Sequence, residues 1–370
     1  MNTTILRKYT IFFCLTAVLH AAPEQGLRLG GNLYSDLSWL QYRTQEGLSG
    51  FAGMSTLELR GRNTDRRFGT VSAQLDLHLL YGRYADAAGQ VNDSIPSSFT
   101  DETPLLMDLR ELYMAFYPPF ADIAIGRQII RFGKGTVLSP LDIFSKLNSS
   151  DIDFKRSGSD VVHVKIPLGI LSGIDLITEL PHGSKEHSSA MKLFTNMGGF
   201  DLDAIALYRH RTGDFSTGAA FKGDILAGVY GEAVVHWKEE KTPHLEAMAG
   251  IDYSFFSRKL ILVLEYRYNS APIDADTVSQ EDILDFSKPF NRTHYLFFNV
   301  SGTVNELLSL QGNMIINPLD RALQGIFLAR YSLLQNISIT PSIRGCYNNL
   351  NGIDLPDPDL TFSLRMEMVF

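Results

Sequence analysis

The chain has 370 residues, of which 45% are hydrophobic and 20% charged, and it contains only two Cys. Its mean hydropathy of −0.02 excludes a collagen, a disordered chain and a multi-helix membrane transporter, and two Cys exclude a disulfide scaffold. The formal net charge of −8 argues against a nucleic-acid-binding protein, because such proteins usually carry a basic excess.

Residues 1–21 have the pattern of a secretory signal peptide. Arg7 and Lys8 supply the positive start, residues 9–19 are mostly apolar, and Ala21 places a small residue before a cleavage point. The apolar run is shorter than the about 20 residues that span a bilayer as a helix. We therefore expect a cleaved signal peptide and one domain over residues 22–370, with Cys346 as its one cysteine.

The rest of the chain alternates between apolar and polar residues with a period of two. In residues 69–82, for example, Leu75, Leu77 and Leu79 fall on one face, and Asp76 and His78 fall on the other. Successive side chains of a strand point to opposite faces, so this alternation predicts strands with one apolar and one polar surface. No later segment holds the about 18 consecutive apolar residues of a transmembrane helix candidate.

Turn signals divide the chain into eighteen predicted strands, with sixteen as the alternative count. The ranges are 27–42, 51–62, 68–83, 105–117, 121–131, 160–167, 172–180, 189–197, 200–210, 216–226, 228–238, 243–256, 259–269, 292–302, 306–316, 321–333, 336–348 and 359–370. Tight turns alternate with the longer connections 84–104, 131–159, 270–291 and 348–358. This rhythm is typical of bacterial outer-membrane barrels.

The predicted fold is an all-β, transmembrane, antiparallel up-and-down β-barrel. The strands run for about 10–13 residues, the length that a tilted strand needs to cross a bilayer, whereas strands of soluble proteins usually have about five or six. Aromatic residues near strand ends, such as Tyr34, Trp39 and Tyr253, are expected in interfacial girdles. Apolar side chains would coat the outside and polar ones would line a lumen. A soluble β-sandwich or propeller is the alternative.

The last predicted strand ends on an aromatic residue. Leu364, Met366, Met368 and Phe370 alternate with polar residues, and Phe370 is the C-terminal residue. The pattern resembles the C-terminal signature of Gram-negative outer-membrane proteins. That resemblance implies an assembly signal at Phe370, read by the barrel-assembly machinery, and contact with outer-membrane lipid.

A more particular resemblance lies in residues 125–144. They contain Gly126-Arg127-Gln128, then Gly133-Lys134-Gly135, then Pro140-Leu141-Asp142-Ile143-Phe144. This stretch is similar to one found in porin-like and alginate-export-like barrels, and the whole mature chain resembles a 16- to 18-stranded Gram-negative porin. The resemblance implies a transport role in the outer membrane without naming a substrate.

Residues 131–159 form the longest connection. In porins the third long loop often folds into the lumen, and we expect this connection to correspond to it. Its mixed charges would orient permeating solutes at a constriction; a solvated surface loop is the alternative. The candidate residues for a pore constriction or lumen lining are Arg60, Asp108, Arg110, Arg127, Arg131, Lys134, Asp142, Glu265 and Arg267. Basic and acidic residues of the polar phase are close to balanced, which argues against a polyanion channel.

The sequence predicts no catalytic residues, no cofactor and no metal site, because no nucleophile motif stands out and the nine His are scattered. The predicted function is a porin-like channel for passive diffusion of small hydrophilic solutes or ions, without a nucleic-acid partner. A non-conducting scaffold or adhesin and an outer-membrane hydrolase are the alternatives. A monomer and a homo-trimer are both compatible with the sequence.

Overall fold

The computed structural model describes residues 27–43, 46–63, 69–86, 104–145, 147, 151–180, 187–210, 213–237, 242–272, 290–348, 350 and 358–370. The predicted signal peptide, residues 1–21, lies outside these ranges. Within them, no helix has the length and apolar character required to cross a membrane.

Eighteen strands make up almost all regular structure in the described ranges. They are β1 (Leu27–Gln41), β2 (Gly50–Asn63), β3 (Thr70–Gly82), β4 (Leu105–Phe116), β5 (Asp122–Gln128), β6 (Ser159–Pro167), β7 (Gly173–Glu179), β8 (Ser188–Met197), β9 (Phe200–Arg209), β10 (Phe215–Asp224), β11 (Gly228–Trp237), β12 (His244–Phe255), β13 (Leu260–Asn269), β14 (His294–Thr303), β15 (Leu308–Asn317), β16 (Ala322–Leu334), β17 (Ile337–Tyr347) and β18 (Leu360–Val369). The strand count predicted from the sequence is confirmed.

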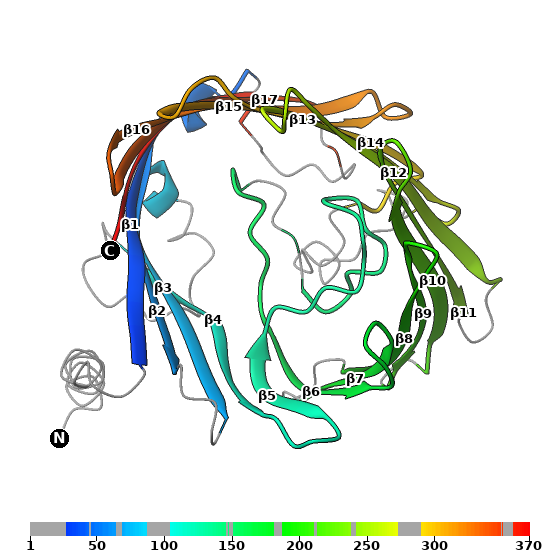
Figure 1. Ribbon diagram of the computed structural model, residues 1–370. Helices are drawn as coiled ribbons and strands as arrows, with labels where there is room; N and C mark the ends of the chain where they lie inside the picture. Colours follow the sequence, from blue (N-terminus) through cyan, green and yellow to red (C-terminus); the bar gives the residue numbers. More distant parts are fainter. Residues whose placement is uncertain are drawn as a thin grey trace.

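The strands form one closed sheet. Each strand pairs antiparallel with its sequence neighbours, and β1 also pairs with β18, from Asn32 opposite Val369 to Gln41 opposite Leu360. Figure 1 shows the resulting ring. Closure leaves no sheet edge with unpaired backbone groups, the condition that allows a sheet to sit in lipid. The predicted up-and-down barrel is confirmed, and the sandwich or propeller alternative is wrong.

The two faces of the wall have the polarity expected of a membrane barrel. On β1, Leu33, Leu37 and Trp39 are between 42% and 48% exposed, whereas Asp36 and Ser38 are 9% and 3% exposed. On this strand most apolar side chains thus face outward and the charged and hydroxyl side chains inward, the reverse of a soluble protein. Tyr34 is an exception to the predicted aromatic girdles. It shares the inward phase of Asp36 and is buried inside the barrel.

The seam between β1 and β18 closes on the last residue. The Phe370 N–H donates to the Gly31 carbonyl at 3.0 Å, and the Gly31 N–H donates to the Phe370 carbonyl at 2.9 Å. A Cβ at Gly31 would lie 2.9 Å from the tip of the Phe370 ring. The glycine therefore leaves room for the terminal ring beside β1.

Deleting Phe370 removes its two hydrogen bonds to Gly31 and the ring contact at the end of the seam, so we expect a smaller fraction of folded barrel. The measurement is the heat-modifiable band of membrane extracts on semi-native gels. Met366→Leu, an outward residue of the same strand, is the matched control and should fold normally. A wild-type folded fraction after the deletion would contradict a role of Phe370 in closure and assembly.

Candidate functional site

The chain leaves the wall after β5 and runs through the interior of the barrel before it rejoins the wall at β6 (Figure 1). We call residues 129–158 the inner loop; they are described except for 146 and 148–150. The prediction that the fifth strand continues to residue 131 is wrong, because β5 ends at Gln128. Ile129 and Ile130 continue the apolar pattern of a strand, but Ile130 packs inside the barrel.

The point of departure is built by Gly126 and Arg127. Gly126 has a φ of 123°, and a Cβ there would lie 2.2 Å from the Leu112 carbonyl oxygen, so a side chain does not fit. The Arg127 guanidinium donates to both carboxylate oxygens of Asp160, at 3.0 and 2.8 Å, and to the Leu109 carbonyl at 3.1 Å. Arg127 thereby joins β4, β5 and β6 where the inner loop begins and ends.

Asp142 organises the inner loop itself. Its Oδ1 accepts the N–H groups of Phe132 and Gly133, at 3.1 and 2.9 Å. Its Oδ2 lies 2.8 Å from the Arg156 guanidinium and 3.6 Å from that of Arg131. The Asp142 side chain is only 4% exposed, so the carboxylate ties both arms of the loop together from within.

The small and aromatic residues of the loop motif have packing roles. A Cβ at Gly133 would lie 1.7 Å from the Ser139 hydroxyl oxygen, and a Cβ at Gly135 would lie 2.5 Å from the Met248 methyl group. Phe132 and Phe144 pack edge to face with ring centroids 5.5 Å apart. The part of residues 125–144 that follows β5 therefore forms a loop folded tightly on itself.

Two wall carboxylates hold the tip of the inner loop. Glu232 on β11 accepts the N–H groups of Lys134 and Gly135 and the hydroxyl of Ser139. Its bond to Gly135 is 2.7 Å long, and its bond to Ser139 is 2.6 Å. Backbone donors that would otherwise be unsatisfied inside the barrel thus find charged acceptors.

Glu265 on β13 holds the next three residues. It accepts the N–H of Thr136, those of Val137 and Leu138 at 3.1 and 2.9 Å, and the Tyr230 hydroxyl at 2.9 Å. Glu265 is fully buried. Together with Glu232, it satisfies five consecutive backbone N–H groups, from residue 134 to residue 138.

The other arm of the inner loop reaches the opposite wall. The Lys155 ammonium donates to the Tyr34 hydroxyl at 2.7 Å and to Glu58, on β1 and β2. Asp153 accepts from Arg365 on β18 at 2.7 Å. At the tip of the inner loop, Lys134 also forms an ion pair of 2.6 Å with Asp203 on β9. The inner loop is therefore fixed to several sides of the lumen, and a solvated surface loop is not what the structure shows.

Apolar side chains on the inner wall support these polar contacts. Ile130, Phe132, Leu141 and Phe144 pack in one cluster with inward residues of β6 to β11, among them Val161, Ile177, Leu207 and Val234. Val137, Leu138 and Leu147 join a second cluster with Tyr295 and Phe297 of β14. Part of the hydrophobic content thus lies inside the barrel, and the expectation of a uniformly polar inner face is corrected.

The remaining predicted site residues lie in two places. Arg60 lies on β2 and pairs with Glu58 at 2.8 Å, while Asp108 and Arg110 lie on β4. Arg110 lies 3.7 Å from Asp76 and donates to the Arg156 carbonyl at 2.8 Å. Asp108 is exposed and stands opposite Asp76 in the strand register. Arg267 lies on β13, where it pairs with Glu246 on β12.

The structure also brings forward charged residues that the sequence did not single out as site residues. Glu232, Lys155, Asp153 and Arg365 contact or belong to the inner loop, and His236, His244 and Glu246 form a separate group on the wall. The wall members share the inward polar phase of their strands. The alternating pattern of the sequence does not distinguish an inward residue that contacts the inner loop from one that faces water.

No family model and no curated protein matches the chain. Several solved outer-membrane porins have a similar structure. OccAB3 of Acinetobacter baumannii matches with a TM-score of 0.59 and 9% identity, over 93% of this chain and 99% of that one. OccK11 of Pseudomonas aeruginosa gives 0.58 and 9%, over 93% and 96%. OmpF of Salmonella typhi, in complex with daunomycin, gives 0.51 and 11%, over 94% and 98%. At identities this low, the structural similarity shows a shared fold alone.

Asp142→Asn should loosen the inner loop, since it keeps the shape but leaves Arg156 without its buried counter-charge. Breaking a buried ion pair costs about 3–5 kcal/mol. We expect faster trypsin cleavage within the inner loop, at Arg131, Lys134, Lys155 or Arg156, measured by mass spectrometry of the folded protein.

The matched control is Asp224→Asn, at an exposed position of β10, which should leave the cleavage pattern unchanged. Equal protease resistance of wild type and Asp142→Asn would show that the loop does not depend on this carboxylate.

Proposed function

We propose that this protein is an outer-membrane channel for the passive diffusion of small hydrophilic solutes or ions. The observation that carries the proposal is a closed barrel of eighteen strands, apolar outside and charged inside, with a loop fixed across its lumen. Barrels of about 16–18 strands are wide enough to enclose an aqueous path. The likeness to solved porins supports the same conclusion.

In this proposal the inner loop is the constriction. Glu265 and Asp142 act by positioning it, because both are buried. Arg60, Arg131 and Asp153 instead keep between 37% and 54% of their side chains exposed while they take part in ion pairs. Charges of both signs would thus face the path, orient polar solutes and give weak selectivity between anions and cations.

The proposal includes a route to the membrane. A signal peptide over residues 1–21 would direct export, and the barrel-assembly machinery would recognise the strand that ends at Phe370. Outer-membrane lipid would then cover the apolar outer face. Export, cleavage and recognition are inferred from the sequence pattern.

The proposal treats the protein as a channel and not as an enzyme. The similarity to porins supports that choice. A scaffold or adhesin would have the same wall but no continuous aqueous path, so conductance separates it from a channel.

Purified protein in planar lipid bilayers should give discrete conductance steps, and Glu265→Gln should raise the size of the steps. The substitution places an amide NH₂ among backbone donors, and each buried N–H left unpaired costs about 1–3 kcal/mol. The tip of the inner loop should therefore leave the wall, and the path should widen.

Glu306→Gln, on the exposed turn between β14 and β15, removes the same charge and should leave the conductance unchanged. An unchanged step size for Glu265→Gln would place the constriction elsewhere. A folded wild-type barrel that inserts but never conducts would reject the channel and favour a scaffold.

A further inference from the structure

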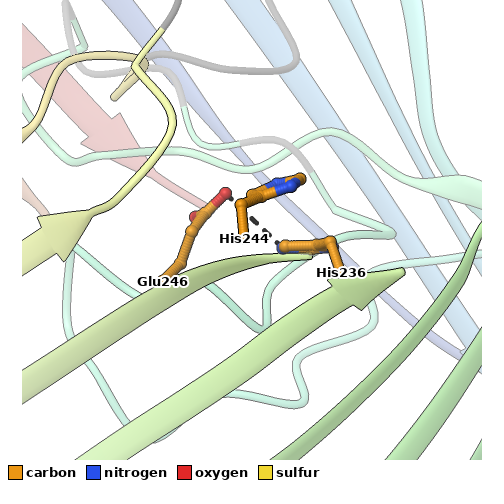
Figure 2. A group of neighbouring side chains, drawn as sticks. All are labelled: His236, His244 and Glu246. Carbon is orange, nitrogen blue, oxygen red and sulfur yellow. Dashed lines mark ion pairs between the residues drawn. The ribbon is translucent and has the colours of Figure 1, made fainter. Parts of the chain in front are cut away.

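Three potential metal ligands gather on the inner side of the hairpin formed by β11 and β12. His236 stands directly opposite His244 in the strand register, and Glu246 follows His244 by two residues on the same face. The two imidazole rings stack with centroids 4.5 Å apart. One ligand atom from each of the three residues lies within 4.8 Å of the others. Figure 2 shows these side chains grouped above the hairpin.

The surroundings of His236 prepare one nitrogen for a ligand. Its Nδ1 lies 2.8 Å from the Ser216 hydroxyl on β10. In the tautomer whose Nδ1–H donates to the Ser216 hydroxyl oxygen, Nε2 presents its lone pair. This Nε2 is buried without a hydrogen-bond partner, in a side chain that is 8% exposed, and it lies 3.5 Å from Glu246 Oε1.

A lone pair that faces a carboxylate oxygen is repulsive unless a positive charge lies between the two atoms. A proton or a metal ion can supply that charge. Arg267 pairs with Oε2 of Glu246 and fixes the orientation of the carboxylate, which leaves Oε1 directed toward the histidines. The positive charge of Arg267 also lowers the affinity for a cation, so the site should bind more weakly than a closed four-ligand zinc site.

We propose that His236, His244 and Glu246 bind a divalent first-row transition metal ion. Two imidazoles and one carboxylate suit Zn²⁺, Cu²⁺ or Ni²⁺ and leave a coordination position for water. The metal would join β11 to β12 where the connection between them begins and ends. The site uses none of the residues that hold the inner loop, so this inference is independent of the proposed channel function.

The chain offers a matched control in a second histidine pair. His187 and His210 also stack, with centroids 4.4 Å apart. Among the described residues no third potential ligand completes a metal group with them. Stacked histidines alone should not bind the metal as the three-residue group does.

The test is titration of Zn²⁺ into the tag-free, chelator-washed, folded barrel by isothermal calorimetry. We expect one ion per barrel, and a loss of affinity of tenfold or more in His244→Ala and in Glu246→Gln. Ser216→Ala should weaken binding by about tenfold through the orientation of His236. His210→Ala should bind as the wild type does.

The melting temperature with and without Zn²⁺ is a second measurement of binding, and it can be interpreted even for a variant that is less stable. Ligand that binds the native state raises the melting temperature, so Zn²⁺ should raise it for wild type and His210→Ala but not for His244→Ala. The proposal is overturned if wild type binds no Zn²⁺, if His244→Ala and Glu246→Gln bind it equally well, or if His210→Ala abolishes binding.

Discussion

Every buried backbone N–H and C=O group needs a hydrogen-bond partner, and this requirement determines the structure of both the barrel wall and the inner loop. In the wall, the chain meets it by closing eighteen strands into a ring, with β1 paired to β18, because lipid offers no partners. Inside the ring, a loop without regular structure has no neighbouring strand to pair with. Glu232 and Glu265 replace the missing strand as hydrogen-bond acceptors, and together they accept five consecutive backbone N–H groups. The wall thus provides both the enclosure and the acceptors that its contents require.

This use of carboxylates fixes the rest of the electrostatics. A buried carboxylate is costly unless donors or cations surround it, and each one here has them: backbone donors at Glu265, Arg156 at Asp142 and Lys155 at Glu58. The buried carboxylates that hold the inner loop are therefore already paired with donors or cations. The charges that remain exposed, such as those of Arg60 and Asp153, are the ones that a solute inside the barrel would meet.

The wall could be predicted closely from the sequence, but the contents of the barrel could not. Alternation such as that of Leu75 and Asp76 is a local signal, and it gave the number and the limits of the strands with small errors. The end of β5 was missed because Ile129 and Ile130 continue the apolar pattern of a strand. Glu265 belongs to the polar phase of its strand, yet the sequence offered no sign that it would be fully buried. The histidine pair on β11 and β12 shows the same difference, since its spacing fits a hairpin but its stacking depends on the exact register.

The sequence by itself determined the architecture, namely an antiparallel barrel with an apolar exterior. It could do so because strand polarity repeats every two residues and needs no knowledge of distant parts of the chain. Only the tertiary structure decided what the interior contains. Lys134 and Glu232 are separated by 98 positions, and Asp153 and Arg365 by 212. Contacts of that kind arise when the ring closes around the loop, and no local periodicity records them.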